Sequence, residues 1–417
     1  MKKESEQNTQ KMNNDVVIVS AARTPFSKFG GVLKKIHSMD LAAMIMEGVL
    51  DKIKIKKSMV DIIYYGMCIQ SEAAIEYNVN ARQAMLKAGF PPETLSLTVD
   101  RACCSSLTAT HLGYKDILLG EADVVMAVGT ENMSNTPFVM HGVRWAKGLE
   151  QPQIRDHLFP VTYNGFTPLA LDAGQVALEH DISREEQDKW AYNSQMRYQQ
   201  AKTKNVFKDE ILPIEVDQSI GNKILFDEDE FPRANTKLEK LATLKTVYGS
   251  PTVTAGNAPG LDTGASAILL MQRKKANELG LEVLGKIVSI ASVALEPRLL
   301  AEAPAPAIEK ALKKAGLTIG DIDRIEINEA FAAMPLVATK MLGKGNVAKT
   351  EQLREITNVN GGAVAIGHPV GASGARILMT LLYELRRSNK RYGVASICGG
   401  LAQGDAVVVE AEYSYNK

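Results

Sequence analysis

The chain is poor in the residues that mark metal-binding, disulfide-linked and nucleic-acid-binding proteins. It holds 4 cysteines in 417 residues, with no CxxC pair and no HxxxH partner, which argues against a disulfide framework and a structural zinc site. Its 48 basic and 48 acidic side chains cancel, so neither nucleic acid nor a membrane surface is expected as its main partner. It also lacks an apolar run of the roughly 20 residues that cross a bilayer.

The two ends of the chain are polar and lack a recognisable targeting sequence. The start, MKKESEQNTQKMNND, is mixed in charge, unlike a secretory or transit peptide, so we expect residues 1–14 to form a disordered extension. The ending YSYNK carries no known address. Because unpaired thiols fit a reducing compartment, these features predict a cytoplasmic protein.

Short β-branched runs alternate with amphipathic stretches along the chain. This alternation predicts an α/β fold with a buried sheet. The expected strands are 15–24, 60–68, 95–99 and 122–129, and the expected helices between them are 38–53 and 105–121.

A similar alternation recurs in the last third of the chain. The matching pairs are 284–295 with 15–24, 321–331 with 58–68, and 391–400 with 122–131. All three pairs are offset by roughly 260 to 270 residues, as a duplicated unit would give. We therefore predict a first half over 15–134 and 251–283, and a second half over 284–417.

The stretch between the halves, residues 135–250, differs in character. It combines loop-like segments with a polar helix for which Ser183 is a plausible N-cap. Long insertions are usually functional, so we interpret this one as a substrate-covering subdomain. The alternative is that it only adds contacts within an oligomer.

Cys103 and Cys104 lie side by side in DRACCSSLTAT, where a strand is expected to end and a helix to begin. Backbone N–H groups and the helix dipole gather at such a junction and favour a thiolate. An unperturbed thiol is only a few per cent ionised at neutral pH, so this placement matters for a nucleophile. A single cysteine is more often a small buried hydrophobe, and the residues alone leave both readings open.

A glycine-rich segment, NVNGGAVAIGHPVGASGAR over 358–376, surrounds His368 and precedes an expected helix. Glycines at this density let the backbone approach a ligand, and a histidine there can be held near a reacting group. The segment lacks the Lys-Ser/Thr ending of a phosphate-binding P-loop. A structural role for His368 remains the alternative.

Two further junctions carry polar or nucleophilic side chains. Cys398 ends an expected strand and enters a glycine-rich turn, and Asn328 and Glu329 follow another strand. Each is weak evidence alone, since Asn328 could simply cap the next helix.

Taken together, these segments resemble the thiolase family, from about residue 15 to residue 412. The segment 358–376 is the most specific match. Others, in the family's order, are VVIVSAARTPFSKFGG, NARQAMLKAG, ADVVMAVGTENMSNTPF, ISREEQDKWAYNSQ, VTAGNAPGLDTGASA and INEAFAA. The resemblance implies the thiolase fold, with two duplicated βαβαβαββ halves in five αβαβα layers and an inserted loop domain over coenzyme A (CoA).

The resemblance also implies roles for individual residues. Cys103 would be the nucleophile that forms an acyl thioester, and His368 would activate it. Cys398 would act as acid and base at the substrate α-carbon or the leaving thiolate. His368 and a water held by Asn328 would form one oxyanion hole, and the backbone N–H groups of Cys103 and Gly400 the other.

The loop expected to touch CoA departs from the family's pattern. Pro259 stands where a serine hydroxyl usually contacts the pantetheine, and proline offers neither a hydroxyl nor a backbone N–H. The contacts are therefore expected from the backbone around Ala255, Gly256 and Ala258.

Other departures concern the acyl pocket. Leu401 and Ala402 replace glycines that usually follow the second cysteine, and Cys104 stands where a small residue is usual. The His-Met element of acetoacetyl-specific thiolases is not evident. These changes put the substrate in doubt more than the reaction.

The implied activity is acyl transfer to or from CoA, with 2 acetyl-CoA = acetoacetyl-CoA + CoA as the expected reaction. CoA and acyl-CoA would be substrates, without a tightly bound cofactor or metal, and a homodimer or homotetramer is expected. The alternatives are a thiolase for longer or modified 3-ketoacyl chains, a ketosynthase-type condensing enzyme, and a non-catalytic protein that binds acyl-CoA or lipid. Cys398 favours thiolase over ketosynthase, which usually has a second histidine or an asparagine there.

Overall fold

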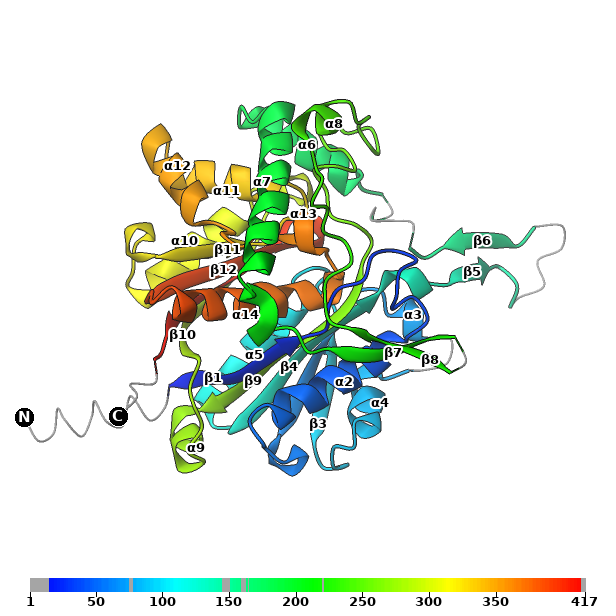
Figure 1. Ribbon diagram of the computed structural model, residues 1–417, viewed down its shortest axis with the longest axis vertical. Helices are drawn as coiled ribbons and strands as arrows, with labels where there is room; N and C mark the ends of the chain where they lie inside the picture. The colour runs from blue at the N-terminus through cyan, green and yellow to red at the C-terminus, as the bar shows by residue number, and fades with distance from the viewer. Residues whose placement is uncertain are drawn as a thin grey trace, which may run out of the picture.

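The computed structural model describes residues 15–74, 78–144, 151–158, 163, 165–219 and 221–413. The extension expected over residues 1–14 lies outside the described residues. Nine strands follow one another in the order β11-β12-β13-β10-β1-β9-β4-β2-β3, and helices cover the sheet on both faces (Figure 1). The predicted α/β class is confirmed.

Five strands form the half of the sheet that the first part of the chain contributes. They are β1 (Val16–Arg23), β2 (Ile62–Gly66), β3 (Leu95–Val99), β4 (Val124–Asn132) and β9 (Thr263–Gln272). β2 pairs in parallel with β3 and β4, while β9 is antiparallel to β1 and β4. The helices of this half are α2 (Ser38–Asp51), α3 (Ser71–Ala74), α4 (Asn80–Lys87), α5 (Ser105–Leu119) and α9 (Arg273–Glu278).

The second half repeats this topology. Its strands are β10 (Gly285–Ala294), β11 (Arg324–Ile327), β12 (Tyr392–Gly399) and β13 (Gln403–Ala411). Its helices are α10 (Pro304–Ala315), α11 (Ala333–Gly343), α12 (Val347–Ile356), α13 (Ala363–Ile366) and α14 (Ser373–Arg387). The three pairs of matching segments become β1 with β10, β2 with β11 and β4 with β12, so the predicted duplication is confirmed.

One strand of the repeat is reduced. The counterpart of β3 in the second half is a single parallel bridge between Thr357 and Ile325. The glycine-rich segment that follows Thr357 turns at once into the loop and short helix α13, so it does not continue along the sheet edge.

Alternating side chains along the strands separate the core into layers. Val124, Met126 and Val128 of β4 pack in an outer core with α2 and α4, whereas Val125 and Ala127 face a central core with α5 and α14. Along β13, Ala406 and Val408 face a second outer core with α10 and α11, and Val407 and Val409 face the central core. The result is the implied αβαβα order, with α5 and α14 packed together in the middle.

The two half sheets meet at the short pairing of β1 with β10. Val17 lies opposite Lys286 and Ile18 opposite Gly285 in this antiparallel contact. This contact joins the two halves into one nine-stranded sheet.

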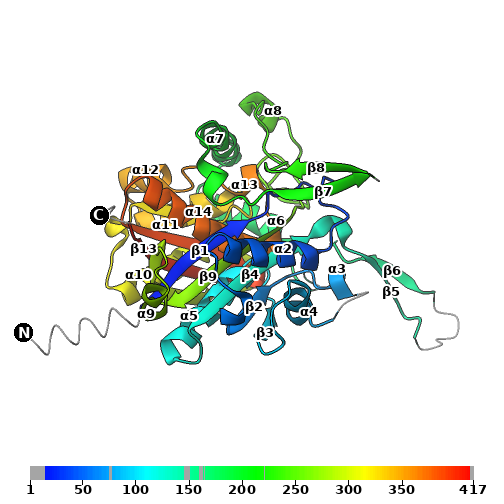
Figure 2. The same ribbon diagram turned by 60° about the horizontal axis from the view of Figure 1, so that its bottom comes forward.

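The segment between the halves forms its own elements outside the large sheet. These are β5 (Phe138–His141), β6 (Gln153–Asp156), α6 (Leu169–Glu179), α7 (Arg184–Thr203), β7 (Ile214–Ser219), β8 (Asn222–Phe226) and α8 (Leu238–Ala242). The predicted cap is confirmed, because Ser183 and Glu186 form a capping box at the start of α7. The β5–β6 hairpin projects away from the body in both views (Figures 1 and 2).

No helix in the described ranges combines the length and apolar character needed to cross a membrane.

A buried ion cluster ties the insertion to β1. Arg23 is fully buried; its Nη1 and Nη2 lie 2.6 and 2.9 Å from the Asp229 oxygens, and its Nε lies 2.7 Å from Glu210 Oε1. The Thr380 hydroxyl of α14 donates to Glu210 Oε2 at 2.9 Å. The cluster therefore joins the first strand, the insertion and the central helix of the second half.

We expect Arg23→Met to lower the free energy of unfolding by about 3–5 kcal/mol, because it leaves two buried carboxylates without their cation. Denaturant titration would measure the change. The triple variant with Glu210→Gln and Asp229→Asn should recover part of the loss. An unchanged value for the single variant would contradict this account.

Candidate active site

Cys103 lies in a strained turn between β3 and α5. The residue before it, Ala102, has φ +50°, a left-handed conformation that costs a non-glycine residue about 1–2 kcal/mol. The Asp100 carboxylate accepts the Ala102 N–H at 2.9 Å, and the Ser105 hydroxyl donates to the Ala102 carbonyl at 2.6 Å. These bonds hold the turn in its strained conformation.

His368 faces this cysteine from the second half. Its Nε2 lies 3.2 Å from Cys103 Sγ, and its Nδ1 lies 2.6 Å from Ser373 Oγ. The Ser373 hydroxyl donates its proton to the Pro369 carbonyl at 2.8 Å, so at His368 it accepts. This assigns the proton to Nδ1 and leaves the Nε2 lone pair free to take a proton from the thiol.

Asn328 and Cys398 complete the group. Asn328 directly follows β11, and its Nδ2 lies 3.4 Å from His368 Nε2. It does not cap a helix, since α11 begins at Ala333. Cys398 lies near the end of β12 and is 2% exposed. The structure thus brings the four predicted side chains of this site together from four different elements.

The Cys398 turn packs tightly on the nucleophile turn. A Cβ on Gly399 would lie 2.8 Å from Cys104 Sγ and 2.9 Å from the Arg101 carbonyl oxygen, so only glycine fits there. Cys104 itself is fully buried, and its Sγ lies 3.5 Å from the Ile397 carbonyl oxygen. Cys104 therefore packs between the halves, while Cys103 keeps part of its surface accessible.

Burial makes the resting pair neutral. It raises the pKa of Cys103 well above its usual range, with the nearby Cys398 adding to the effect. Burial, followed by the Arg376 charge, lowers the pKa of His368. Burial also raises the pKa of Cys398 to about 12. The helix terminus by itself favours a thiolate, but desolvation outweighs the backbone dipoles at Cys103.

The loop expected to contact CoA is bonded to the segment that follows Asn328, because the Ala332 N–H donates to the Asn257 carbonyl at 2.9 Å. Ala255 is exposed, and Gly256 and Ala258 are half-buried. Asn257 anchors the loop: its side chain donates to Asp188 of α7 at 2.9 Å and accepts the Thr254 N–H at 2.8 Å. The Gly256 N–H is already bonded to Thr254 Oγ1 at 3.1 Å, so its amide is not free for a ligand.

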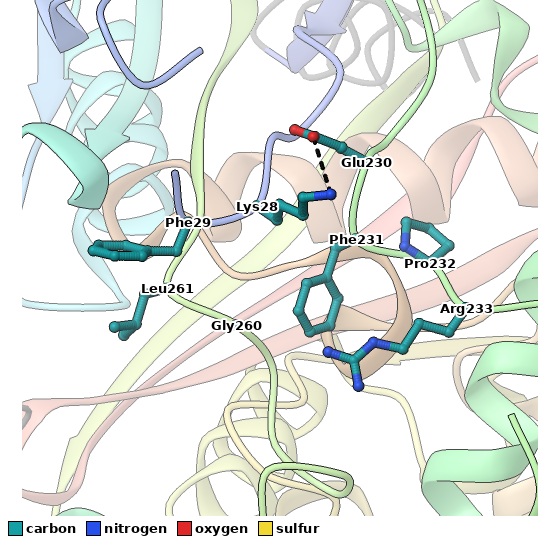
Figure 3. Close-up of a pocket in the computed structure, with 8 residues that line it drawn as sticks. All are labelled: Lys28, Phe29, Glu230, Phe231, Pro232, Arg233, Gly260 and Leu261. Atoms are coloured by element: carbon teal, nitrogen blue, oxygen red, sulfur yellow. Dashed lines mark ion pairs between the residues drawn. The ribbon is translucent and has the colours of Figure 1, made fainter. Parts of the chain in front are cut away.

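A cavity of about 420 Å³ continues from this loop. Figure 3 shows Phe231 next to Gly260, with the Arg233 side chain near the same ring and Lys28 paired with Glu230. The Arg233 guanidinium lies 5.1 Å from the centre of the Phe231 ring, and Lys28 Nζ lies 3.3 Å from Glu230 Oε1. The cavity therefore combines the flat apolar face of Phe231 with the cationic side chains of Arg233 and Lys28.

The two residues that directly follow Gly400 both adopt backbone conformations that glycine would tolerate better. Leu401 has φ +56° and Ala402 has φ +58°. Each left-handed residue costs about 1–2 kcal/mol, so this turn is held in strain by its surroundings.

Three residues of the site were not singled out from the sequence. Ser373 fixes the His368 tautomer, as described above. Tyr163 lies over Gly400: a Cβ on this glycine would be 2.0 Å from the tyrosine hydroxyl. Asp262 Oδ2 accepts the His368 N–H at 2.7 Å. Ser373 and Asp262 lie within segments that resemble the family, 358–376 and 253–267, whereas Tyr163 carries no local signal, because only the fold brings it to the site.

Among the described residues, no group of three or more His, Cys, Asp or Glu side chains is arranged to hold a metal ion. The site instead pairs a partly accessible thiol with a histidine lone pair, and adds a second thiol and an amide. This is the arrangement of nucleophilic acyl transfer, in which a base activates the nucleophile and a second acid/base acts on the other substrate.

Comparison with known proteins agrees with this chemistry. Residues 16–274 match the model of the thiolase N-terminal domain, and residues 281–411 match that of the thiolase C-terminal domain. The chain belongs to the thiolase family.

Relatives of this thiolase carry two different activity names. It is 41% identical to an acetyl-CoA acetyltransferase of Syntrophomonas wolfei subsp. wolfei, over 96% of this chain and 100% of the relative. It is 40% identical to a 3-ketoacyl-CoA thiolase of Vibrio vulnificus, over 95% of this chain and 99% of the relative. It is an acyltransferase of this family, and the relatives do not select one substrate.

A solved structure supports the fold in the same way. The crystal structure of human mitochondrial 3-ketoacyl-CoA thiolase in complex with CoA matches the chain with a TM-score of 0.88 and 37% identity. The match covers 96% of this chain and 99% of that one. The predicted family and the implied thiolase fold are confirmed.

Asp262 gives a prediction about pH. Burial, with Asp229 nearby, raises the pKa of Asp262 from 3.8 to about 7, and its Oδ1 has no partner among the described residues. The folded state therefore holds a proton that the unfolded chain releases, so the free energy of unfolding should fall as pH rises from about 4 to about 7. The variant Asp262→Asn keeps a side-chain oxygen that can accept the His368 N–H, but its amide does not take up a proton in this pH range.

The comparison of the two proteins isolates the Asp262 contribution. Thermal unfolding midpoints measured from pH 4 to pH 8 should decline less steeply for Asp262→Asn than for the wild type, because other buried carboxyls titrate in both. If the midpoints of the two proteins fell in parallel with pH, the raised pKa of Asp262 would be contradicted.

Proposed function

We propose that the chain catalyses 2 acetyl-CoA = acetoacetyl-CoA + CoA through an acyl-enzyme on Cys103. The observation that carries this proposal is the 3.2 Å contact between Cys103 Sγ and His368 Nε2, with Cys398 on the adjoining turn. The alternative is a thiolase for a longer or modified 3-ketoacyl chain, which the 3-ketoacyl-CoA thiolase relatives favour.

In the first half-reaction, His368 Nε2 takes the Cys103 proton as Sγ attacks the thioester carbonyl. Because both groups rest neutral, proton transfer and attack occur together rather than from a preformed thiolate. The carbonyl oxygen becomes negative and is stabilised by the backbone N–H groups of Cys103 and Gly400. The C–S bond to CoA then breaks, and Cys398 protonates the departing thiolate.

In the second half-reaction, the Cys398 thiolate removes a proton from the α-carbon of a second acetyl-CoA. His368, now protonated at Nε2, and a water held by Asn328 stabilise the enolate oxygen. The α-carbon attacks the acyl-enzyme carbonyl, the C–S bond to Cys103 breaks, His368 returns its proton to the Cys103 sulfur, and acetoacetyl-CoA leaves. Losing one oxyanion donor typically costs about 10²–10³ in kcat.

CoA and acyl-CoA act as substrates in this proposal, and no tightly bound cofactor is needed. The backbone around Ala255 and Ala258 would contact the pantetheine. The cavity beside it, with Phe231 and Arg233, suits a group with both a flat ring and negative charge, such as the nucleotide of CoA. The human relative's structure holds CoA, which supports this assignment.

The predicted division of the chain is part of the proposal. Residues 15–134 with 251–283 and residues 284–417 would form the catalytic halves, and residues 135–250 would cover CoA. A homodimer or homotetramer in the cytoplasm remains our expectation.

Tyr163 supports a short acyl group. Its hydroxyl lies against Gly400, and burial followed by Cys103 raises its pKa, so the phenol stays protonated beside the nucleophile. A ring in this position limits the room that an acyl chain can occupy next to Cys103.

The acyl-enzyme can be tested directly. Mass spectrometry of the intact protein after mixing with acetoacetyl-CoA should show an acetyl adduct that maps to the Cys103 peptide and is removed by free CoA. Cys103→Ala should abolish the adduct, whereas Cys104→Ala, the matched control, should retain it and most activity. No adduct with any acyl-CoA would contradict the proposed function, and equal loss in both variants would reassign the nucleophile.

The substrate range can be tested at Tyr163. Tyr163→Ala should raise kcat/KM for a six-carbon 3-ketoacyl-CoA relative to acetoacetyl-CoA by about tenfold, since removing bulk from an apolar pocket shifts selectivity by that order. Tyr163→Phe, which keeps the ring, should leave the ratio near the wild-type value. A wild-type preference for the six-carbon substrate would favour the alternative function.

A further inference from the structure

The two turns that carry Cys103 and Cys398 belong to different halves, and an ion pair joins them. Arg101 lies two residues before Cys103, and its Nη1 is 2.8 Å from each oxygen of Asp405. Asp405 lies opposite Ile397 in the register of β12 and β13, next to Cys398. The pair therefore joins the segment that precedes Cys103 to the part of β13 that lies beside Cys398.

A second side chain extends the connection to the oxyanion hole. Arg101 Nε donates to Gln403 Oε1 at 3.0 Å, and Gln403 Nε2 donates to the Gly400 carbonyl at 3.4 Å. Gly400 is the residue whose backbone N–H pairs with that of Cys103 in the proposed mechanism. The guanidinium thus contacts two side chains of β13, and one of them, Gln403, reaches back to the Gly400 carbonyl.

The pair is also fixed from the helix side. Thr108 of α5 accepts a hydrogen bond from Arg101 Nη1 at 2.8 Å and donates to Asp405 Oδ2 at 2.6 Å. The Asp405 side chain is fully buried, while the Arg101 side chain is 22% exposed. A buried carboxylate with this many partners has one defined position, and it fixes the guanidinium with it.

Arg101 performs no bond-making step in the proposed mechanism, so its contacts call for another role. We propose that Arg101 is a positioning residue that sets the separation between the Cys103 and Gly400 N–H groups, and hence the geometry of the oxyanion hole. The inference rests on the proposed function. Its physical basis is that two donors on separate halves share one oxyanion only if their separation is held to a fraction of an ångström.

The test separates positioning from folding. Arg101→Gln leaves Asp405 buried without its cation, so both the thermal midpoint and kcat should fall, with kcat reduced about 10²-fold and the KM for acetyl-CoA little changed. The double variant Arg101→Gln, Asp405→Asn removes the unpaired charge, so its midpoint should recover. Its kcat should stay low, because the connection from the nucleophile turn to the Gly400 turn is still missing.

Arg101→Lys provides the conservative comparison. A lysine ammonium keeps the charge but cannot bind both Asp405 oxygens and Gln403 in one plane. We expect its midpoint to lie near that of the wild type and its kcat to lie between those of the wild type and Arg101→Gln.

A matched ion pair away from the site serves as control. Arg273 Nη1 lies 2.9 Å from Glu412 Oε2 and also joins the two halves, near the far ends of β9 and β13. Arg273→Gln and its double variant with Glu412→Gln should shift the midpoint and leave kcat within about twofold of the wild type.

Each outcome bears on the proposal. If kcat recovers together with the midpoint in the Arg101/Asp405 double variant, or if Arg101→Gln behaves like Arg273→Gln, the positioning role is overturned. Failure of the proposed function itself is recognised separately, as a wild type that forms no acyl-enzyme. If Arg101→Gln does not fold, the Arg101→Lys and double variants still decide between the two roles.

Discussion

The candidate active site depends on one contact between residues 265 positions apart, the 3.2 Å approach of Cys103 Sγ to His368 Nε2. Neither half carries a complete site. The duplicated topology places the nucleophile turn of one half and the glycine-rich turn of the other side by side, because α5 and α14 pack together between the sheets. A fold with one half alone would hold a thiol without a base.

Strain and buried charge concentrate around this contact. Ala102, Leu401 and Ala402 all have positive φ without being glycine, and they flank the two cysteine turns. The Cys398 turn packs closely on the Cys103 turn at Gly399, and this packing helps to hold the strained conformations. The Arg101–Asp405 ion pair lies in the same region, with the Asp405 side chain fully buried. The junction of the halves therefore holds both the strained residues and this ion pair.

Burial also sets how the site starts its reaction. Cys103 and His368 both lose solvent, which raises the pKa of one and lowers that of the other, so the resting pair is uncharged. A neutral resting thiol is less exposed to oxidation than a thiolate. In the proposed mechanism it reacts when a thioester is bound, because the oxyanion that then forms is stabilised by the site.

The sequence by itself determined the α/β class, the duplication and several of the strands and helices, because periodicity is a local property. It singled out Cys103, His368, Cys398 and Asn328 through short motifs, which are also local, and their roles came from the resemblance to the thiolase family. It could not determine the neutral state of the thiol, since that depends on how much water the assembled halves exclude. Nor could it identify Tyr163, Asp262 or the Arg101–Asp405 pair. Their roles come from neighbours far away in the chain, and only tertiary packing decides which neighbours those are.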